Sequence, residues 1–194
     1  MCIRDSVSNP LLAGTFAVSW DIETLFPYKE NLFIGAESGM FIYGLSDPLN
    51  PNYLSKFQHA RACDPVFVKD DYAFVTLRDG TTCEGFSNQM DVVDISSLTN
   101  PFLVDSYQLD NPHGLSIRGD DLYLCDGRSG LRVLDIENVE SISEIERKDN
   151  FDAYDAISIP NKEVLLVVGK NGLFQFDVSN SSDLRQISSI AINR

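Results

Sequence analysis

The chain has 194 residues, of which 43% are hydrophobic and 23% are charged, and its formal net charge is −14. These values suit a packed domain of ordinary size or a run of small repeated units, and they argue against disorder. A charge of this sign repels phosphate backbones and anionic lipids, so nucleic acid and bare membrane surface are not expected partners, and no uncharged apolar run is long enough to be transmembrane.

The first segment in chain order, MCIRDS, fits none of the repeats described below and resembles translated sequencing-adapter DNA. We therefore interpret residues 1–6 as non-native. Residues 7–19 are predicted to supply one isolated strand, from Leu11 to Ala17, which would be the last strand of a preceding unit. We therefore expect the chain to be part of a longer protein.

The remaining sequence is predicted to form four units of four short strands, which span 20–58, 59–109, 110–149 and 150–194. The first strands are expected to begin at Asp21, Asp64, His113 and Asp155. The second strands are LFIGA, YAFVTL, DLYLCD and VLLVVG, which are rich in β-branched, leucine and aromatic residues. Turns that contain glycine follow them, as expected for hairpins.

The third strand of each unit repeats one phrase, seen most clearly as QMDVVDI, GLRVLDI and GLFQFDV. Its copies begin at Met40, Met90, Leu131 and Leu173, which are 50, 41 and 42 residues apart. One unit is therefore longer than the others, and its extra residues are assigned to a turn over 78–89. Fourth strands follow the Asn-Pro pairs that begin at Asn50 and Asn100.

Two side-chain roles are predicted for the repeated phrase. Leu131 and Val133 should pack inward while Arg132 points outward, because successive side chains alternate along a strand. The aspartate that ends the phrase, at Asp94, Asp135 and Asp177, is expected to close an Asx turn into the fourth strand.

Several strands, VLLVVG above all, are apolar on both faces, which indicates sheets that are covered on both sides. Four-stranded units of about 41 residues that bury each other's faces are the blades of a β-propeller. The predicted fold is therefore an all-β propeller of four-stranded antiparallel blades. About four blades are present, and they are expected to form an incomplete ring; a closed four-bladed ring is the alternative.

The pattern G-L-x-V-x-D-I followed by N-P-x-L-V resembles the LVIVD-repeat family of exported bacterial and archaeal β-propellers. The resemblance covers residues 7–194 and is strongest in the second and third units; the first has Gly44 in place of the aspartate, and the fourth lacks the Asn-Pro pair. It implies an exported or cell-surface protein but specifies no activity.

Cys63 and Cys83 are expected to lie on one rim of the second blade, within reach of each other. A disulfide between them would hold the long turn and indicate an oxidising compartment. Two free thiols in a cytosolic protein are the alternative. Cys125, in contrast, is predicted to be a small buried core residue.

The first strands of a propeller line its axis, so the positions that open them are candidates for binding. Asp21, Asp64, His113 and Asp155 would form an axial set of three carboxylates and one imidazole, which could hold a divalent cation. Arg61 and Arg78 are expected on the same face. Polar residues at strand entries can equally serve only to satisfy backbone groups.

The sequence therefore predicts a non-catalytic binding or scaffolding propeller that requires no cofactor and lies in the periplasm, on the outer membrane surface or outside the cell. Its partners would be a protein or cell-surface ligand, together with the missing blades of the same chain. Two alternatives stay open. One is a metal-dependent hydrolase or lyase that uses the axial set, and the other is a cytosolic protein-interaction propeller.

Overall fold

The computed structural model describes residues 12, 14–20, 22–59, 65–79 and 87–192. These residues form sixteen strands in four antiparallel sheets. None of them forms a helix that could cross a membrane. Expected positions Asp21, Arg61, Cys63, Asp64 and Cys83 lie outside the described residues.

Each sheet contains four strands that are consecutive in the chain. The first sheet contains β1 (Ile22–Tyr28), β2 (Asn31–Ala36), β3 (Gly39–Gly44) and β4 (Asn52–Phe57). The second contains β5 (Val66–Lys69), β6 (Tyr72–Leu77), β7 (Gln89–Asp94) and β8 (Phe102–Gln108). The third contains β9 (Leu115–Arg118), β10 (Asp121–Cys125), β11 (Leu131–Asp135) and β12 (Ser143–Lys148). The fourth contains β13 (Ala153–Ser158), β14 (Val164–Gly169), β15 (Gly172–Asp177) and β16 (Arg185–Ala191).

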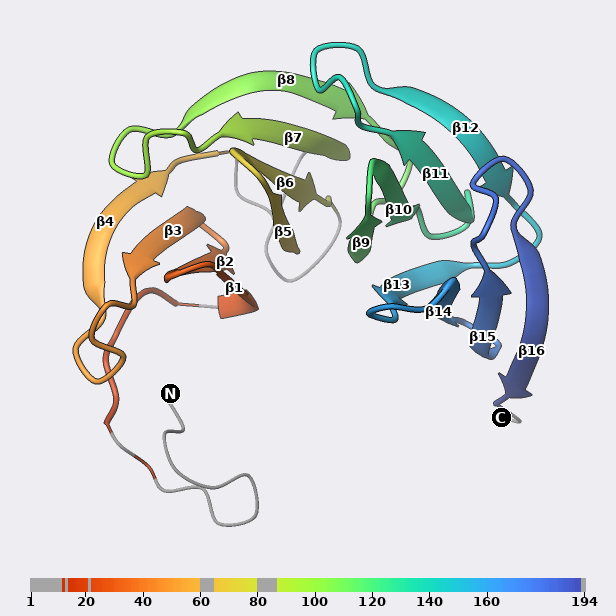
Figure 1. Cartoon of the computed structure of the whole chain (residues 1–194), viewed down its shortest axis with the longest axis horizontal. Coiled ribbons are helices and arrows are strands. Elements are labelled where there is room, and N and C mark those ends of the chain that lie inside the picture. Colours follow the sequence, from red (N-terminus) through yellow and green to blue (C-terminus); the bar gives the residue numbers. More distant parts are fainter. Residues whose placement is uncertain (1–11, 13, 21, 60–64, 80–86, 193–194) are drawn as a thin grey trace.

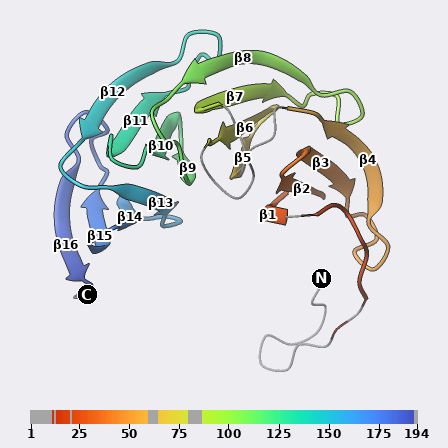
Figure 2. The ribbon, with the colours of Figure 1, turned by 180° about the vertical axis from the view of Figure 1, so that it is seen from behind.

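The four sheets are arranged as the blades of a propeller along an open arc (Figure 1). The first strand of each blade lies at the inside of the arc and the fourth strand at the outside, as the reverse view also shows (Figure 2). The first and last blades stand at the two ends of the arc. The predicted all-β propeller of four-stranded antiparallel blades is thus confirmed.

The repeated phrase occupies the third strand of every blade, as predicted. Its copies run along β3, β7, β11 and β15. The four copies also share one irregularity, because the register with the fourth strand shifts between Ile42 and Tyr43 and at the corresponding place in the other blades. A bulge bends the strand that carries the extra residue, so the same curvature of the outer strand recurs in each blade.

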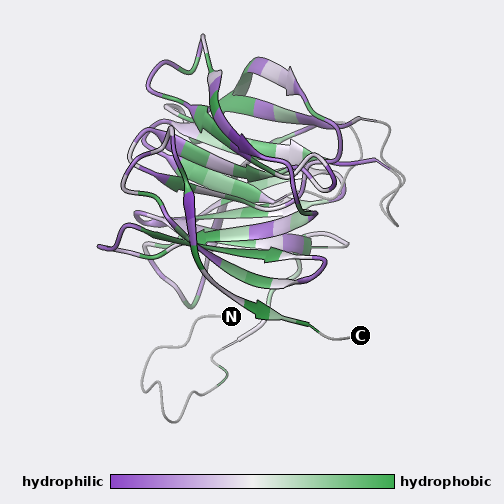
Figure 3. Cartoon of the chain, turned by 90° about the vertical axis from the view of Figure 1, so that its right-hand side faces the viewer, coloured by the Kyte–Doolittle hydropathy of each residue, from purple (hydrophilic) through white to green (hydrophobic). Residues whose placement is uncertain are grey.

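The strands of the blades are largely hydrophobic (Figure 3), and apolar side chains pack between neighbouring blades. Between the first and second blades they are Phe33, Met40, Ile42, Val66, Val68, Ala73, Val75, Leu77, Val93 and Ile95. Similar clusters lie between the second and third blades and between the third and fourth. Cys125 belongs to the last of these and is fully buried, as expected. The two-sided apolarity of the strands therefore follows from burial against a neighbour on each side.

The Asx turns after the third strands are formed as predicted. Asp94, Asp135 and Asp177 each accept a hydrogen bond from the backbone N–H two residues later, at 2.8, 2.9 and 3.0 Å. The bond from Ser179 is the main reason why the pKa of Asp177 falls to about 2. These turns direct the chain from the third strand into the loop before the fourth.

The prediction that Arg132 points to solvent is wrong. Its side chain is only 12% exposed, because its guanidinium bonds to the carboxylate of Asp126, which is fully buried, as well as to Asp110 and Glu144. A buried carboxylate needs such charge-assisted partners. The alternation of the strand is correct, but the outward position is enclosed by the loops at this rim.

The expected strand from Leu11 to Ala17 is not seen in the part of this segment that the structure describes, residues 12 and 14–20. Phe16 and Val18 lie against the outer face of the first blade instead. The ring of Phe16 lies 5.4 Å from that of Tyr43, and Val18 packs beside Ile34 and Phe41. A strand needs a partner for its backbone hydrogen bonds, and here the segment meets side chains on the face of a sheet.

Candidate ligand site at the propeller axis

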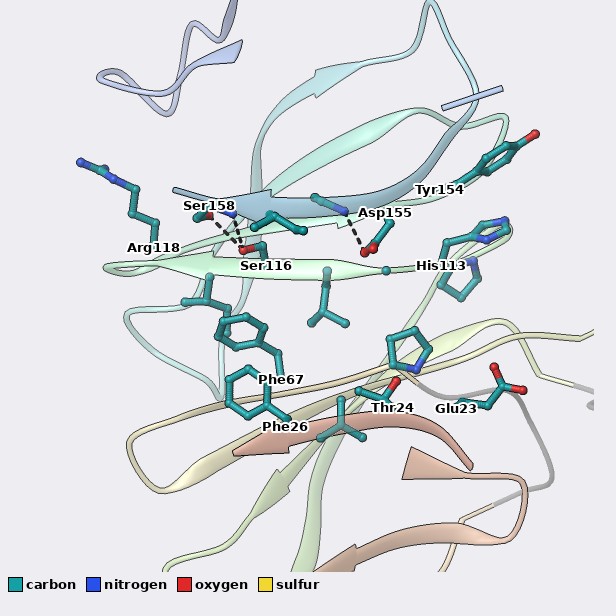
Figure 4. A pocket seen from close by; sticks show the side chains of 18 of the residues that line it. Glu23, Thr24, Phe26, Phe67, His113, Ser116, Arg118, Tyr154, Asp155 and Ser158 are labelled. Atoms are coloured by element: carbon teal, nitrogen blue, oxygen red, sulfur yellow. Dashed lines mark hydrogen bonds between the residues drawn. The ribbon is translucent and has the colours of Figure 1, made fainter. Parts of the chain in front are cut away.

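The four first strands enclose a cavity of about 880 Å³ at the inside of the arc. Its walls come from β1, β5, β9 and β13, together with the residues that lead into β9 and Arg78 at the end of β6. Figure 4 shows this cavity with polar side chains toward one end and two phenylalanine rings toward the other. It is the place where the sequence predicted a site.

A shared bulge determines which side chains stand at the polar end. The register of the first strand shifts at Glu23 in the first blade and at Tyr154 in the fourth. In the third blade Cys125 hydrogen bonds to both His113 and Gly114, which places His113 at the same position. Figure 4 shows Glu23, His113 and Tyr154 at one end of the cavity.

His113 and Asp155 of the predicted axial set both line the cavity, but they do not occupy equivalent positions in their blades. Asp155 is the third residue of β13, one place after Tyr154, and corresponds to Gly114 rather than to His113. Asp21 and Asp64 lie outside the described residues. Glu23 and Tyr154 were missed, because the shift in strand register at each of them cannot be read from the sequence.

Asp155 lies in the wall between the third and fourth blades. A Cβ atom at Gly114 would overlap its carboxylate, so the absence of a side chain at Gly114 makes room for it. The carboxylate accepts the backbone N–H of Ala156 at 2.9 Å. Partial burial raises the pKa of Asp155 above its ordinary value despite this bond.

His113 and Arg78 form a close pair on the cavity wall. Nη1 of Arg78 lies 2.8 Å from Nδ1 and 3.1 Å from Nε2 of the imidazole. Burial and the guanidinium charge together lower the pKa of His113 to about 4. The imidazole is therefore neutral near pH 7 and accepts a hydrogen bond from Arg78.

Two further contacts hold this pair in place. The hydroxyl of Thr76 donates to the backbone carbonyl of His113 at 2.8 Å. The ring of Tyr154 lies 5.2 Å from the imidazole in a tilted arrangement. The guanidinium of Arg78 is thus oriented by a side chain that is itself fixed, and it retains donors for a ligand because it has five N–H groups.

The far part of the cavity combines hydroxyls with aromatic rings. Ser116 donates to the hydroxyl of Ser158 at 3.0 Å and accepts the backbone N–H of Ser158 at 2.9 Å. The rings of Phe26 and Phe67 lie 4.4 Å apart. Figure 4 shows the serine pair between β9 and β13 and the two phenylalanine rings on the other side of β9.

Polar contacts between neighbouring hairpins hold the blades around this cavity. The residue that ends each first strand reaches the hairpin of the next blade: Tyr28 accepts the backbone N–H of Asp70, Lys69 pairs with Asp120, and Arg118 pairs with Glu163. The same position thus joins the first blade to the second, the second to the third and the third to the fourth.

Comparison with known families identifies the repeat. Residues 60–109 and 112–149 match the LVIVD repeat. The chain folds as a β-propeller, and its second and third blades match this repeat. No curated protein gave a significant match.

Solved structures similar to this chain are propellers of low sequence identity. AztD from Citrobacter koseri is 16% identical with a TM-score of 0.63, and the match covers 85% of this chain and 46% of AztD. The periplasmic gluconolactonase PpgL of Pseudomonas aeruginosa is 13% identical with a TM-score of 0.68, covering 88% of this chain and 54% of PpgL. A protein from Lactobacillus plantarum is 13% identical with a TM-score of 0.73, covering 92% and 58%.

These likenesses concern the fold alone, because every identity is low. The chain spans about half the length of these solved proteins.

The described part of the propeller does not bring together three or more histidine, cysteine or acidic side chains that could hold a metal ion. Arg78 contacts both ring nitrogens of His113, the atoms by which an imidazole would bind a metal. Its positive charge would also repel a cation at this position. The described walls offer the guanidinium of Arg78 and the carboxylates of Glu23 and Asp155, together with hydroxyls and apolar side chains.

Proposed function

We propose that this chain is a non-catalytic binding module of the bacterial envelope, and that its ligand occupies the axial cavity. The observation that carries the proposal is the fixed pair of Arg78 and His113 on the wall of a cavity of about 880 Å³. A guanidinium that is oriented before the ligand arrives loses little conformational entropy on binding. This arrangement therefore favours binding of a ligand.

The state of His113 supports binding over catalysis. A general base works best when its pKa lies near the working pH, whereas the pKa of His113 is about 4. Its nearest polar contact is a guanidinium, which disfavours the protonated state that general acid–base catalysis would require. The ligand would be a protein segment or a cell-surface molecule, and the net charge of −14 disfavours nucleic acid.

The cavity can be tested by filling it. Ile157 lines the cavity and is 57% exposed, so Ile157→Trp adds bulk without disturbing a packed core. We expect a thermal-shift screen of envelope-derived glycans, peptides and metabolites to yield ligands that stabilise the native chain and not this variant. Ile145→Trp on the outer strand β12, at a residue 36% exposed, is the matched control and should respond like the native chain. A screen in which no compound discriminates the variants would contradict the proposal.

The envelope location is tested by the cysteines. We expect Cys63 and Cys83 to form a disulfide that holds the long turn over 78–89, because both are assigned to one rim of one blade. Peptide mapping of the unreduced protein should show the two cysteines in one linked fragment. Recovery of both as alkylated thiols, from protein secreted through the periplasm, would argue instead for a cytosolic propeller.

A further inference from the structure

We infer that the axial cavity recognises an oligosaccharide that carries a carboxylate, with Arg78 as its anchor for the acid group. The inference rests on the proposed function and specifies its ligand. It depends on three features that line one cavity: a preoriented guanidinium, hydroxyl and carboxylate groups, and aromatic rings.

Arg78 is the anchor because its positive charge is not neutralised by its contact with His113. The imidazole of His113 is neutral, so it orients the guanidinium without neutralising it. Among the described residues, no carboxylate forms an ion pair with Arg78. A planar fork of N–H donors matches a carboxylate through two parallel hydrogen bonds. An acid group on the ligand would therefore form an ion pair with Arg78, which has no carboxylate partner among the described residues.

The middle of the cavity suits the hydroxyl groups of a sugar. Ser116 points its hydroxyl hydrogen at Ser158, which leaves the Ser158 hydroxyl hydrogen available to a ligand. The carboxylate of Asp155 accepts one hydrogen bond from the backbone N–H of Ala156 and can accept others from ligand hydroxyls. Asp155 would repel a second acid group placed beside it, so a single carboxylate held at Arg78 fits the cavity best.

The aromatic wall suits the apolar face of a sugar ring. Phe26 and Phe67 line the cavity and offer apolar ring surface on the side of β9 away from the serines. His113 and Ser116 are three residues apart on one extended stretch, which corresponds to about 10 Å. That span is longer than a single pyranose ring, so the ligand should contain at least two sugar units.

The test compares two disaccharides that differ only in the acid group. Cellobiouronate and cellobiose are identical except that one CH2OH group is a carboxylate in the former. We expect isothermal titration calorimetry on the whole chain to show that cellobiouronate binds at least about tenfold more tightly, the effect of one charge-assisted hydrogen-bonded pair. Arg78→Met should remove this preference, and Arg78→Lys should restore part of it because the charge returns without the fork.

Arg185→Met is the matched control, because it removes the same charge from the exposed outer strand β16. It should keep the full preference. The His113 ring resonances, followed by NMR, should move when cellobiouronate is added to the native chain. This second readout does not depend on the folding of any variant.

Each other outcome contradicts a defined part of the inference. Equal binding of the two disaccharides would overturn recognition of the acid group but leave the cavity as a binding site. A preference that survives in Arg78→Met would overturn the role of Arg78. Binding of neither disaccharide would overturn the choice of a saccharide, while the ligand screen with Ile157→Trp would still decide the proposed function separately.

Discussion

At the scale of single residues, the pair of Arg78 and His113 shows how a guanidinium group can be held in a fixed orientation at a propeller axis. An imidazole ordinarily takes up a proton as the pH falls through 6.5, but burial and the neighbouring guanidinium keep His113 neutral down to about pH 4. Its protonation is unfavourable in the folded chain, because the charged form would lose solvation and face a like charge.

The pair predicts a measurable titration. The folded pKa of His113 lies below its unfolded value of 6.5, so its neutral form contributes stability above that pH, which is lost as the pH falls from 6.5 toward 4. NMR titration of the ring protons should give a pKa near 4 in the native chain. Arg78→Met should raise the pKa, though not fully to 6.5, because burial remains the larger cause.

His113→Gln supplies the assignment and the control for this titration. Its unfolding free energy should decline less steeply between pH 6.5 and pH 4 than that of the native chain. Identical slopes in the two proteins, or a native His113 that titrates near 6.5, would show that the imidazole is not held as the structure indicates.

A second prediction concerns the contact between Gly114 and Asp155. Gly114→Ala should destabilise the chain by about 1–3 kcal/mol, because the new methyl group overlaps the Asp155 carboxylate. Urea unfolding measures the loss. Asp155→Ala removes the obstacle, so Gly114→Ala should cost much less in that background. Equal costs in both backgrounds would mean that the close approach is not what requires glycine at Gly114.

At the scale of the element, the repeat is maintained by features that lie at strand ends rather than in strand centres. An Asx turn follows the third strand in three blades, and a bulge bends the fourth strand in all four. Both features act on the backbone, so they tolerate wide variation of the apolar residues between them. This explains why the aspartate that ends the repeated phrase is easier to recognise in successive repeats than any core residue.

The Asx turns lead to a test on Asp135. Asp135→Ala removes the acceptor for the backbone N–H of Glu137 and should lower the unfolding free energy by about 1 kcal/mol. Asp135→Asn keeps an oxygen at the same place and should lose less than half as much. Thermal and urea unfolding of the three proteins would measure this order, and an asparagine variant as unstable as the alanine variant would contradict it.

At the scale of the whole molecule, the arc makes the inner blades more enclosed than the outer ones. The second and third blades are covered on both faces, whereas the fourth blade leaves Ile157, Val168, Ile187 and Ile190 between 45% and 67% exposed. Every residue of β16 is exposed. Stability in such repeat arrays is a sum over blades and the interfaces between them.

Amide hydrogen exchange should therefore show a gradient along the chain. We expect β6, β7, β10 and β11 to exchange most slowly, and β16 to exchange fastest among the strands, because local opening requires less buried surface to be exposed at the end of the arc. Mass spectrometry of peptides from each blade measures this. Uniform protection across the four blades would show that the end faces are covered in solution.

Most of the fold could be predicted from the sequence, because the features that specify it are local and repeated. Two-sided apolarity, glycine turns, the aspartate after the third strand and the spacing of the repeated phrase each follow from the neighbours of a residue in the chain. The position of Arg132 and the path of residues 14–20 could not, since both depend on which distant segments enclose them.

The axial site, too, was predictable from the sequence only in part. The sequence by itself determined that first-strand residues such as His113 line an axis, because each blade buries its strands in the same order. Only the tertiary structure decided that Tyr154, not Asp155, shares the position of His113, and that Arg78 meets it. The physical reason is that side chains alternate along a strand, so one bulged residue moves every neighbour to the other side. Only the pairing of β13 with β14 determines where that residue falls.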